Sequence, residues 1–171
     1  MRWIGISGSW RQNAPSLKRD VEREVTEIIK RGDGIVTGGA LGVDHIATAC
    51  VVRLEPSLTL LKIILPTDLA TYLAHYRKQA QNGVITAFQA REHGQLLKLV
   101  YKTRPQSLIW AQTGKMVNEK SYHARNKLIA EAAGELVAFQ VNKSVGTQQT
   151  IDHARTIGNK VTVFRYKIKK I

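Results

Sequence analysis

Cysteine is nearly absent from this sequence, and other shortages exclude further classes of protein. Cys50 is the single cysteine among 171 residues, so neither an internal disulfide nor a cysteine-based zinc cluster is expected. No apolar run approaches the ~18 residues of a membrane-spanning helix. The N-terminus also lacks the basic start, apolar core and cleavage site of a secretory signal. These absences predict a cytoplasmic protein without a membrane segment.

Residues that could hold a metal or attack a substrate are also sparse. The five histidines show no i, i+4 pair and no accompanying cluster of acids: His45, His75, His93, His123 and His153. No serine lies in the Gly-x-Ser-x-Gly context of a hydrolase nucleophile. We therefore expect no metal, no cofactor and no catalytic residue of these kinds.

Acidic residues are half as numerous as basic ones. Thirteen Asp and Glu face 26 Lys and Arg, which gives a formal charge of +13. The acids gather at residues 20–33, mixed with basic side chains as on an ordinary solvated helix face. Residues 98–128 instead hold seven basic side chains against Glu119 alone, and residues 160–171 hold five and no acid. Two such segments favour a nucleic acid or a phosphorylated ligand, although a solubilising surface is the alternative.

Short apolar stretches alternate with amphipathic ones along a chain whose length suits one domain over residues 1–171, with a basic C-terminal end at 165–171. Periodicity predicts strands at residues 3–6, 34–37, 60–65, 107–110, 136–140 and 160–166. It predicts helices from Pro15 to a stop at Gly32, and at 43–53, 68–81, within 89–101, 119–133 and 147–157. This alternation predicts an α/β fold, a mainly parallel sheet with helices on both faces.

The loops that follow the strands are the places to look for ligand contacts. Right-handed crossovers bring all strand-to-helix loops to one edge of a parallel sheet, and ligands bind at that edge. The loops expected there are residues 7–11, 38–44, 66–68, 111–119 and 141–147.

Two of these loops contain glycine and hydroxyl residues suited to phosphate. In ISGSWR, Gly8 permits a close backbone approach, Ser9 can donate to phosphate, and Arg11 can add a bidentate contact. An ordinary turn explains the same residues equally well. In TGGALGVD, three glycines between a strand and a helix offer backbone N–H groups to an anion: Gly38, Gly39 and Gly42. The spacing fits neither a P-loop nor the dinucleotide fingerprint.

Three further elements could serve the site or only the fold. Asp44 either caps the helix after TGGALG or contacts a ligand. Arg125-Asn126 lies near the start of an amphipathic helix, where Tyr122 could stack on a base or pack inside the protein. Gly146-Thr147 opens a helix directly after a strand, which is either an anion site or an ordinary cap.

The order GSWR, GGALGVD, YHARN and VGTQQTIDHA resembles the SLOG superfamily of Rossmann-like domains. Within it, GGALGVDHIATA is most similar to the loop and helix of the DNA processing protein A (DprA/Smf) group, and the resemblance covers residues 3–163. It does not extend to the accessory domains that flank the core in DprA proteins. It implies a Rossmann-like fold that binds nucleotides, nucleotide-derived ligands or single-stranded DNA, which DprA proteins help load with a recombinase.

The resemblance also implies a set of site residues. Phosphate or nucleotide contacts are expected from Gly8, Ser9, Arg11, Gly38, Gly39, Gly42, Asp44, Arg125, Asn126, Gly146 and Thr147. Contacts to a nucleic-acid strand are expected from Trp10, Lys115, Lys120, Tyr122 and Lys127. One departure concerns the first loop: in DprA-type proteins the arginine directly follows Gly-Ser, whereas here Trp10 separates them, so Arg11 can point elsewhere.

An enzyme of the same superfamily is the main alternative. Its phosphoribohydrolases use the glutamate of PGGxGTxxE, and in SVGTQQT this position is Thr150, whose hydroxyl cannot replace a carboxylate. We therefore expect a DprA-like module that binds single-stranded DNA or a nucleotide in DNA processing and recombination. A phosphoribohydrolase-type enzyme and a small-nucleotide sensor are the alternatives. A homodimer and a recombinase partner are implied by the resemblance alone.

Overall fold

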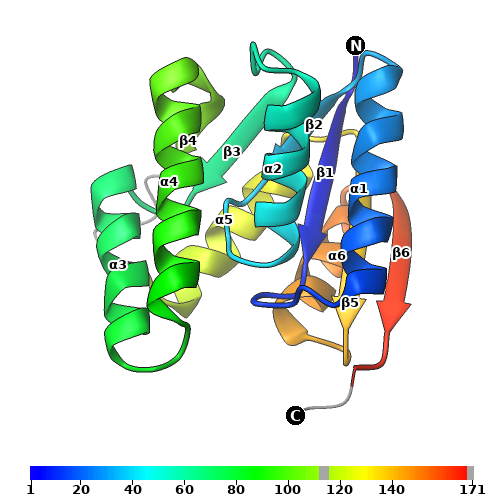
Figure 1. Cartoon of the computed structure of the whole chain (residues 1–171). Helices are drawn as coiled ribbons and strands as arrows, with labels where there is room; N and C mark the ends of the chain where they lie inside the picture. Colours follow the sequence, from blue (N-terminus) through cyan, green and yellow to red (C-terminus); the bar gives the residue numbers. More distant parts are fainter. Residues whose placement is uncertain (112–115, 169–171) are drawn as a thin grey trace.

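A single parallel sheet forms the centre of the protein, which a computed structural model describes at residues 1–111 and 116–168. The described strands lie in the order β4-β3-β2-β1-β5-β6, and every neighbouring pair is parallel (Figure 1). Their bounds are β1 (Trp3–Gly8), β2 (Gly34–Thr37), β3 (Leu61–Leu65), β4 (Leu108–Trp110), β5 (Glu135–Val141) and β6 (Lys160–Tyr166).

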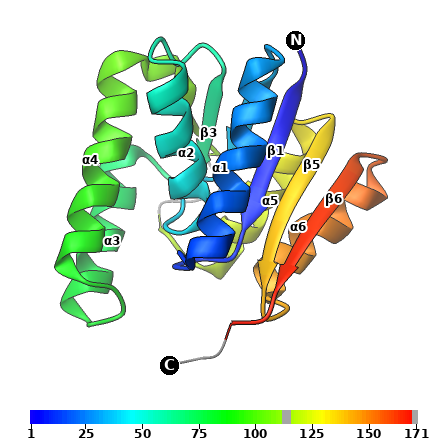
Figure 2. The ribbon, with the colours of Figure 1, turned by 45° about the vertical axis from the view of Figure 1, so that its right-hand side comes forward.

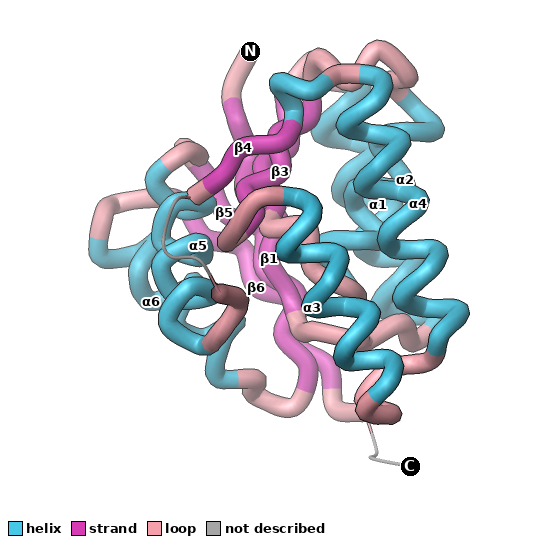
Figure 3. The backbone as a smooth tube through the Cα atoms, turned by 90° about the vertical axis from the view of Figure 1, so that its left-hand side faces the viewer, coloured by secondary structure: helices cyan, strands magenta, loops and turns pink. Residues whose placement is uncertain are grey.

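Helices cover both faces of this sheet. They are α1 (Pro15–Lys30), α2 (Val43–Leu54), α3 (Leu69–Gln81), α4 (Ala87–Thr103), α5 (Glu119–Glu131) and α6 (Val145–Thr156), with a short 3-10 helix at Pro105–Ser107. Figure 3 shows α1, α2 and α4 on one side of the sheet and α5 and α6 on the other, while α3 packs beside α4. The predicted α/β fold with helices on both faces is confirmed.

Burial on two faces explains why the central strands are mostly apolar. In β2, Ile35 joins the core beneath α1, α2 and α4, whereas the next residue, Val36, packs with Ile129 of α5. In β3, Ile63 and Ile64 divide in the same way. Because successive side chains of a strand point to opposite faces, a strand covered on both sides needs apolar residues at every position.

Local capping explains where the helices begin. Pro15 opens α1, as predicted, because its missing N–H has no partner in the first turn. α4 begins at Ala87, before the expected range, because Thr86 and Gln89 form a capping box. Asn118 and Ser121 form the equivalent pair before α5.

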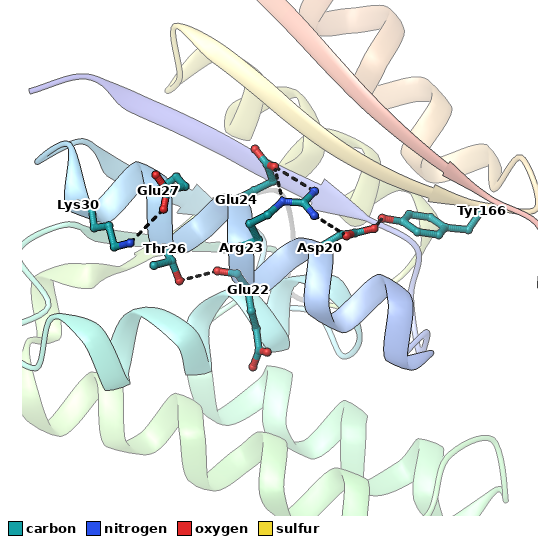
Figure 4. Close-up of polar contacts among 8 residues, drawn as sticks. All are labelled: Asp20, Glu22, Arg23, Glu24, Thr26, Glu27, Lys30 and Tyr166. Carbon is teal, nitrogen blue, oxygen red and sulfur yellow. Dashed lines mark hydrogen bonds and ion pairs between the residues drawn. The ribbon is translucent and has the colours of Figure 1, made fainter.

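The acidic segment at residues 20–33 forms a solvated helix face, as its mixed charges predicted. On α1, Arg23 pairs with Asp20 and Glu24, and Lys30 pairs with Glu27 (Figure 4). The hydroxyl of Tyr166 also donates to Asp20 at 2.8 Å, which links the end of β6 to α1. The other two acids of the segment pair beyond this face, Asp33 with Arg2 and Glu22 with Arg53 of α2.

The strand order fixes where a ligand would bind. The chain adds β2, β3 and β4 on one side of β1, and β5 and β6 on the other, so the switch point lies between β1 and β5 (Figure 2). Parallel sheets of this kind bind ligands outside the carboxyl ends of the strands at the switch point.

Among the described helices, none is long and apolar enough to span a bilayer.

Candidate phosphate-binding site

A cavity of about 530 Å³ opens at the carboxyl ends of β1 and β5, at the switch point. Four segments supply most of its wall: the loop after β1, one face of α3, the first turns of α5, and the loop between β5 and α6. The cavity therefore lies at the sheet edge where strand-to-helix loops were expected to converge.

Three hydroxyl groups join the loop after β1 to the start of α6. The Oγ of Ser9 accepts from the backbone N–H of Val141 at 2.8 Å and lies 2.7 Å from the Oγ of Ser144. Ser144 in turn donates to the Oγ1 of Thr147 at 2.8 Å. Since each hydroxyl has one proton, Ser9 must donate to Ser144, and the proton of Thr147 remains at the end of this chain. Thr147 can therefore donate to a bound group.

The N-terminus of α6 is open toward the cavity. Ser144 occupies the N-cap position, but its side chain makes no capping bond to the backbone. The first N–H groups of a helix have no partner within the helix, and together with the helix dipole they attract anions. A Cβ added to Gly146 would meet no atom within 4 Å, and Val145 is 69% exposed. We call residues 144–147 the open entrance.

Arg125 and Asp44 form a buried ion pair in the cavity wall. Nη1 of Arg125 lies 3.4 Å from Oδ2 of Asp44, and both side chains are more than nine-tenths buried. Burial raises the pKa of the Asp44 carboxyl, and the guanidinium of Arg125 opposes that shift. The guanidinium also lies 5.3 Å from the Tyr122 ring. Its Nε is buried and has no hydrogen-bond partner among the described residues, so an anionic ligand could supply one.

The glycine-rich loop before α2 is packed rather than open. A Cβ at Gly38 would overlap the guanidinium of Arg125, and one at Gly42 would lie 2.7 Å from the carbonyl oxygen of Ser9. The N–H of Ala40 donates to Asp44 at 3.2 Å, and the N–H of Leu41 donates to the Tyr76 hydroxyl at 2.9 Å. The protein itself therefore satisfies two donors that were candidates for phosphate. We call residues 38–44 the closed entrance.

The structure brings most of the predicted site residues to the cavity wall. Those that line it are Gly8, Ser9, Trp10, Asp44, Tyr122, Arg125, Asn126, Gly146 and Thr147. Gly38, Gly39 and Gly42 lie outside the lining, and a Cβ at any of them would overlap neighbouring atoms. Lys120 and Lys127 are exposed on α5 and also lie outside the lining, while Lys115 lies outside the described residues.

Arg11 turns away from the cavity. Its backbone is left-handed, with φ of 62°, and its Nη1 donates to the carbonyl oxygen of Val84 at 2.6 Å. Its guanidinium lies 4.5 Å from the centre of the Trp10 ring. With Trp10 inserted before it, the arginine of the first loop therefore lies beside the cavity and outside its lining.

The wall that α3 and the following turn supply was not predicted from the sequence. His75 and Gln79 of α3 and Val84 of the turn line the cavity. His123 of α5, which the sequence placed beside Tyr122 as a second ring that could stack on a base, also lines it. Burial lowers the pKa of His75. The predicted helix at 68–81 gave no sign of which face would turn toward the site, because that depends on packing against α4.

Comparison with known proteins shows the family of the whole chain. The model of the DNA recombination-mediator protein A family matches residues 1–170. The chain belongs to this family. The resemblance to the DprA group is therefore confirmed, while no curated protein sequence matches the chain.

Solved structures show the same fold at low sequence identity. DNA processing protein A of Helicobacter pylori, described with a unique single-stranded DNA binding mode, superposes with a TM-score of 0.68 at 21% identity over 95% of this chain. The Streptococcus pneumoniae protein gives 0.54 at 15% over 95%, and the molybdenum cofactor carrier of Chlamydomonas reinhardtii gives 0.57 at 16% over 95%. This DprA-family chain spans 64%, 58% and 76% of those three chains, respectively.

Proposed function

We propose that this DprA-family chain binds single-stranded DNA through its phosphates in the cavity at the ends of β1 and β5, and acts in DNA processing and recombination. The observation that carries the proposal is the open entrance, where the N-terminus of α6 and the Thr147 hydroxyl border the same cavity. Arg125 lines the same cavity, and its Nε has no hydrogen-bond partner among the described residues. Family membership and the single-stranded DNA bound by the H. pylori relative support the same ligand.

The cavity supplies donors for phosphate and surfaces for bases. A phosphate at the open entrance would accept from the backbone of Gly146 and from Thr147, with Asn126 as a neighbouring amide. Trp10 lines the cavity and is 38% exposed, so one face of its ring can receive a base. Stacking of this kind contributes about 1–3 kcal/mol per base and is tolerant of sequence. The proposal therefore predicts binding with little sequence preference.

A small nucleotide is the second candidate, because the cavity volume lies within the range of about 300–1,000 Å³ for small-molecule sites. Cleavage of such a nucleotide has less support. Thr150 is buried and donates to the carbonyl of Gly146 at 3.0 Å, outside the cavity lining. Of the carboxylates that the described residues place in the wall, Asp44 is paired with Arg125 and Glu119 is exposed beside His123.

Two further proposals rest on the family resemblance alone: a homodimer and a recombinase partner. A place in the cytoplasm stays a prediction from the sequence. The chain spans less than two thirds of both DprA chains compared with it, so recombination-mediator activity of the whole protein is likewise a proposal.

A charge placed at the open entrance tests the proposal. Gly146→Asp adds a carboxylate where the structure has open space, and an acid in the first turn stabilises a helix. Gly146→Asn is the matched variant without the charge. We expect the Asp variant to bind oligothymidine about tenfold more weakly than the Asn variant, because the carboxylate repels phosphate. Equal affinities would contradict the proposed site, and full displacement of the strand by equimolar thymidine monophosphate would favour the small nucleotide.

A further inference from the structure

A second hollow of about 540 Å³ lies between α3 and α4. α3 separates it from the cavity, since His75 and Gln79 line the cavity while Arg77 and Ala80 line the groove. Small side chains form much of its floor, among them Ala87, Ala90 and Gly94. Three cationic side chains border it, Arg77, Arg91 and Lys98, and none of the described residues that line it is acidic. We call this the α3–α4 groove.

A continuous series of exposed rings and arginines joins the cavity to this groove. Trp10 lines the cavity, and the guanidinium of Arg11 lies 4.5 Å from its ring. Arg11 is bonded to Val84 in the turn between α3 and α4, and it lines a small cleft together with Phe88. The guanidinium of Arg91 lies 5.3 Å from the Phe88 ring and also borders the groove. Aromatic and cationic groups therefore alternate from the cavity to the groove.

The exposed ring of Phe88 and the charge of the groove are both available to a ligand. The Phe88 ring is 61% exposed, although burying such a ring would be favourable. Glu92 is the acid on the connecting cleft, and its carboxylate is 3.9 Å from Arg91. Arg77 and Lys98 have no ion-pair partner among the described residues, so the groove has a net positive charge. Stacked bases and phosphates match both features in one ligand.

We propose that a single strand bound in the cavity leaves it at Trp10, crosses Arg11 and Phe88, and continues along the α3–α4 groove, where Arg77, Arg91 and Lys98 bind its phosphates. This inference rests on the proposed function and extends the same site. From Arg91 to Lys98 the groove follows about 10 Å of α4, at about 1.5 Å per residue. A strand too short to pass Trp10 gains nothing from these three side chains.

The test compares two strand lengths and two charge-matched triple variants. Fluorescence anisotropy at several salt concentrations would follow oligothymidines of about 6 and about 20 nucleotides, lengths that bracket typical single-strand sites. The groove variant is R77Q/R91Q/K98Q. The control variant, K30Q/R155Q/K160Q, removes the same charge at exposed positions at the ends of α1 and α6 and the start of β6, at the opposite edge of the sheet. Its two surface ion pairs contribute little to stability.

The inference predicts a loss that depends on strand length. For the long strand, the groove variant should reduce the slope of log affinity against log salt by about 2, because each phosphate contact on a single strand contributes about 0.7. The short strand should bind the groove variant as it binds the unchanged protein. Phe88→Ala should weaken the long strand about fivefold or more, the loss expected for one stacked base, and leave the short strand unaffected.

Each contrary result has its own meaning. If the unchanged protein binds neither strand, the proposed function and this inference both fail. If the groove variant binds the long strand as tightly as the unchanged protein does, the inference fails. The cavity site is then tested separately by the Gly146 variants. The inference also fails if the groove variant loses affinity equally for both strand lengths, or if the control variant loses as much affinity for the long strand. In either case the positive charge attracts DNA in general and does not mark a path along the groove.

Discussion

The open entrance before α6 and the closed entrance before α2 differ in a way that their sequences do not show. The closed entrance has three glycines, yet its loop is packed against Arg125, the core and the backbone of the first loop. The open entrance has Gly146 alone, and a side chain there would meet open space. Glycine in a strand-to-helix loop can thus make room for the protein's own atoms or for a ligand. Only the open entrance leaves the first N–H groups of a helix beside the cavity.

The closed entrance also holds Arg125 in place. The absence of a side chain at Gly38 leaves room for the guanidinium, and Asp44 at the start of α2 pairs with it. The closed entrance should therefore contribute mainly to stability, and the open entrance mainly to affinity.

Arg125→Ala should produce the largest loss of stability. It leaves the buried carboxylate of Asp44 without its partner, which costs about 3–5 kcal/mol when one member of a buried pair is removed. Urea denaturation would measure this loss, and Asp44→Asn in the same chain should recover part of it. A loss below about 1 kcal/mol would show that the pair does not hold the closed entrance together.

Gly38→Ala and Gly146→Ala compare the two entrances directly. At Gly38 the added methyl group overlaps the Arg125 guanidinium, so we expect a cost of about 1–3 kcal/mol from overpacking. At Gly146 the methyl group meets nothing, and alanine favours a helix, so stability should stay the same or rise slightly. Thermal unfolding of both variants gives the measurement. Similar midpoints for the two would remove the distinction between the entrances.

Acid should lower the stability of the protein through two buried histidines next to the closed entrance. The Nδ1 atoms of His45 and His93 lie 3.0 Å apart, and burial lowers the pKa of both rings, that of His93 to about 3. The unfolded chain, with a histidine pKa of about 6.5, binds these protons more readily. The contribution of these neutral rings to the free energy of unfolding is therefore fully present above about pH 6.5, and it is lost as the pH drops toward 3. His93 alone predicts a loss of about 2 kcal/mol at about pH 5.

Urea denaturation at several pH values measures that loss, and His93→Gln should flatten the dependence. His75→Gln is the matched comparison, because the His75 ring is less buried and its pKa is lowered less strongly. An unchanged slope in His93→Gln would mean that other groups bind the protons. This loss of stability arises from the residues packed behind the closed entrance, and it does not involve the open entrance.

Local signals in the sequence predicted the elements well. β2 and β6 have the predicted bounds, and β1 runs two residues beyond Ile6 to Gly8. For β1 and β2 the continuous apolar run is sufficient, because burial on two faces requires apolar residues at successive positions. Pro15 and Gly32 mark the ends of α1 in the same local way. The missed start of α4 depends on Thr86 and Gln89, a capping box that the sequence also contains.

The candidate site could be predicted only in part. The loops that converge on it follow from the parallel sheet, and nine of the predicted residues line the cavity. The sequence does not show that Arg125 would meet Asp44, which lies 81 positions away, or that Gly38 would serve that contact. Nor does it show which face of α3 would complete the wall, because these facts depend on how the elements pack.

Equilibrium binding of a labelled oligothymidine, followed by anisotropy at several salt concentrations with duplex DNA as competitor, tests the central claim most directly. The account predicts binding to the single strand that duplex DNA displaces poorly. The logarithm of its affinity should fall with the logarithm of salt at about 0.7 per phosphate bound. The absence of binding, or displacement by duplex DNA at equal nucleotide concentration, would contradict the account.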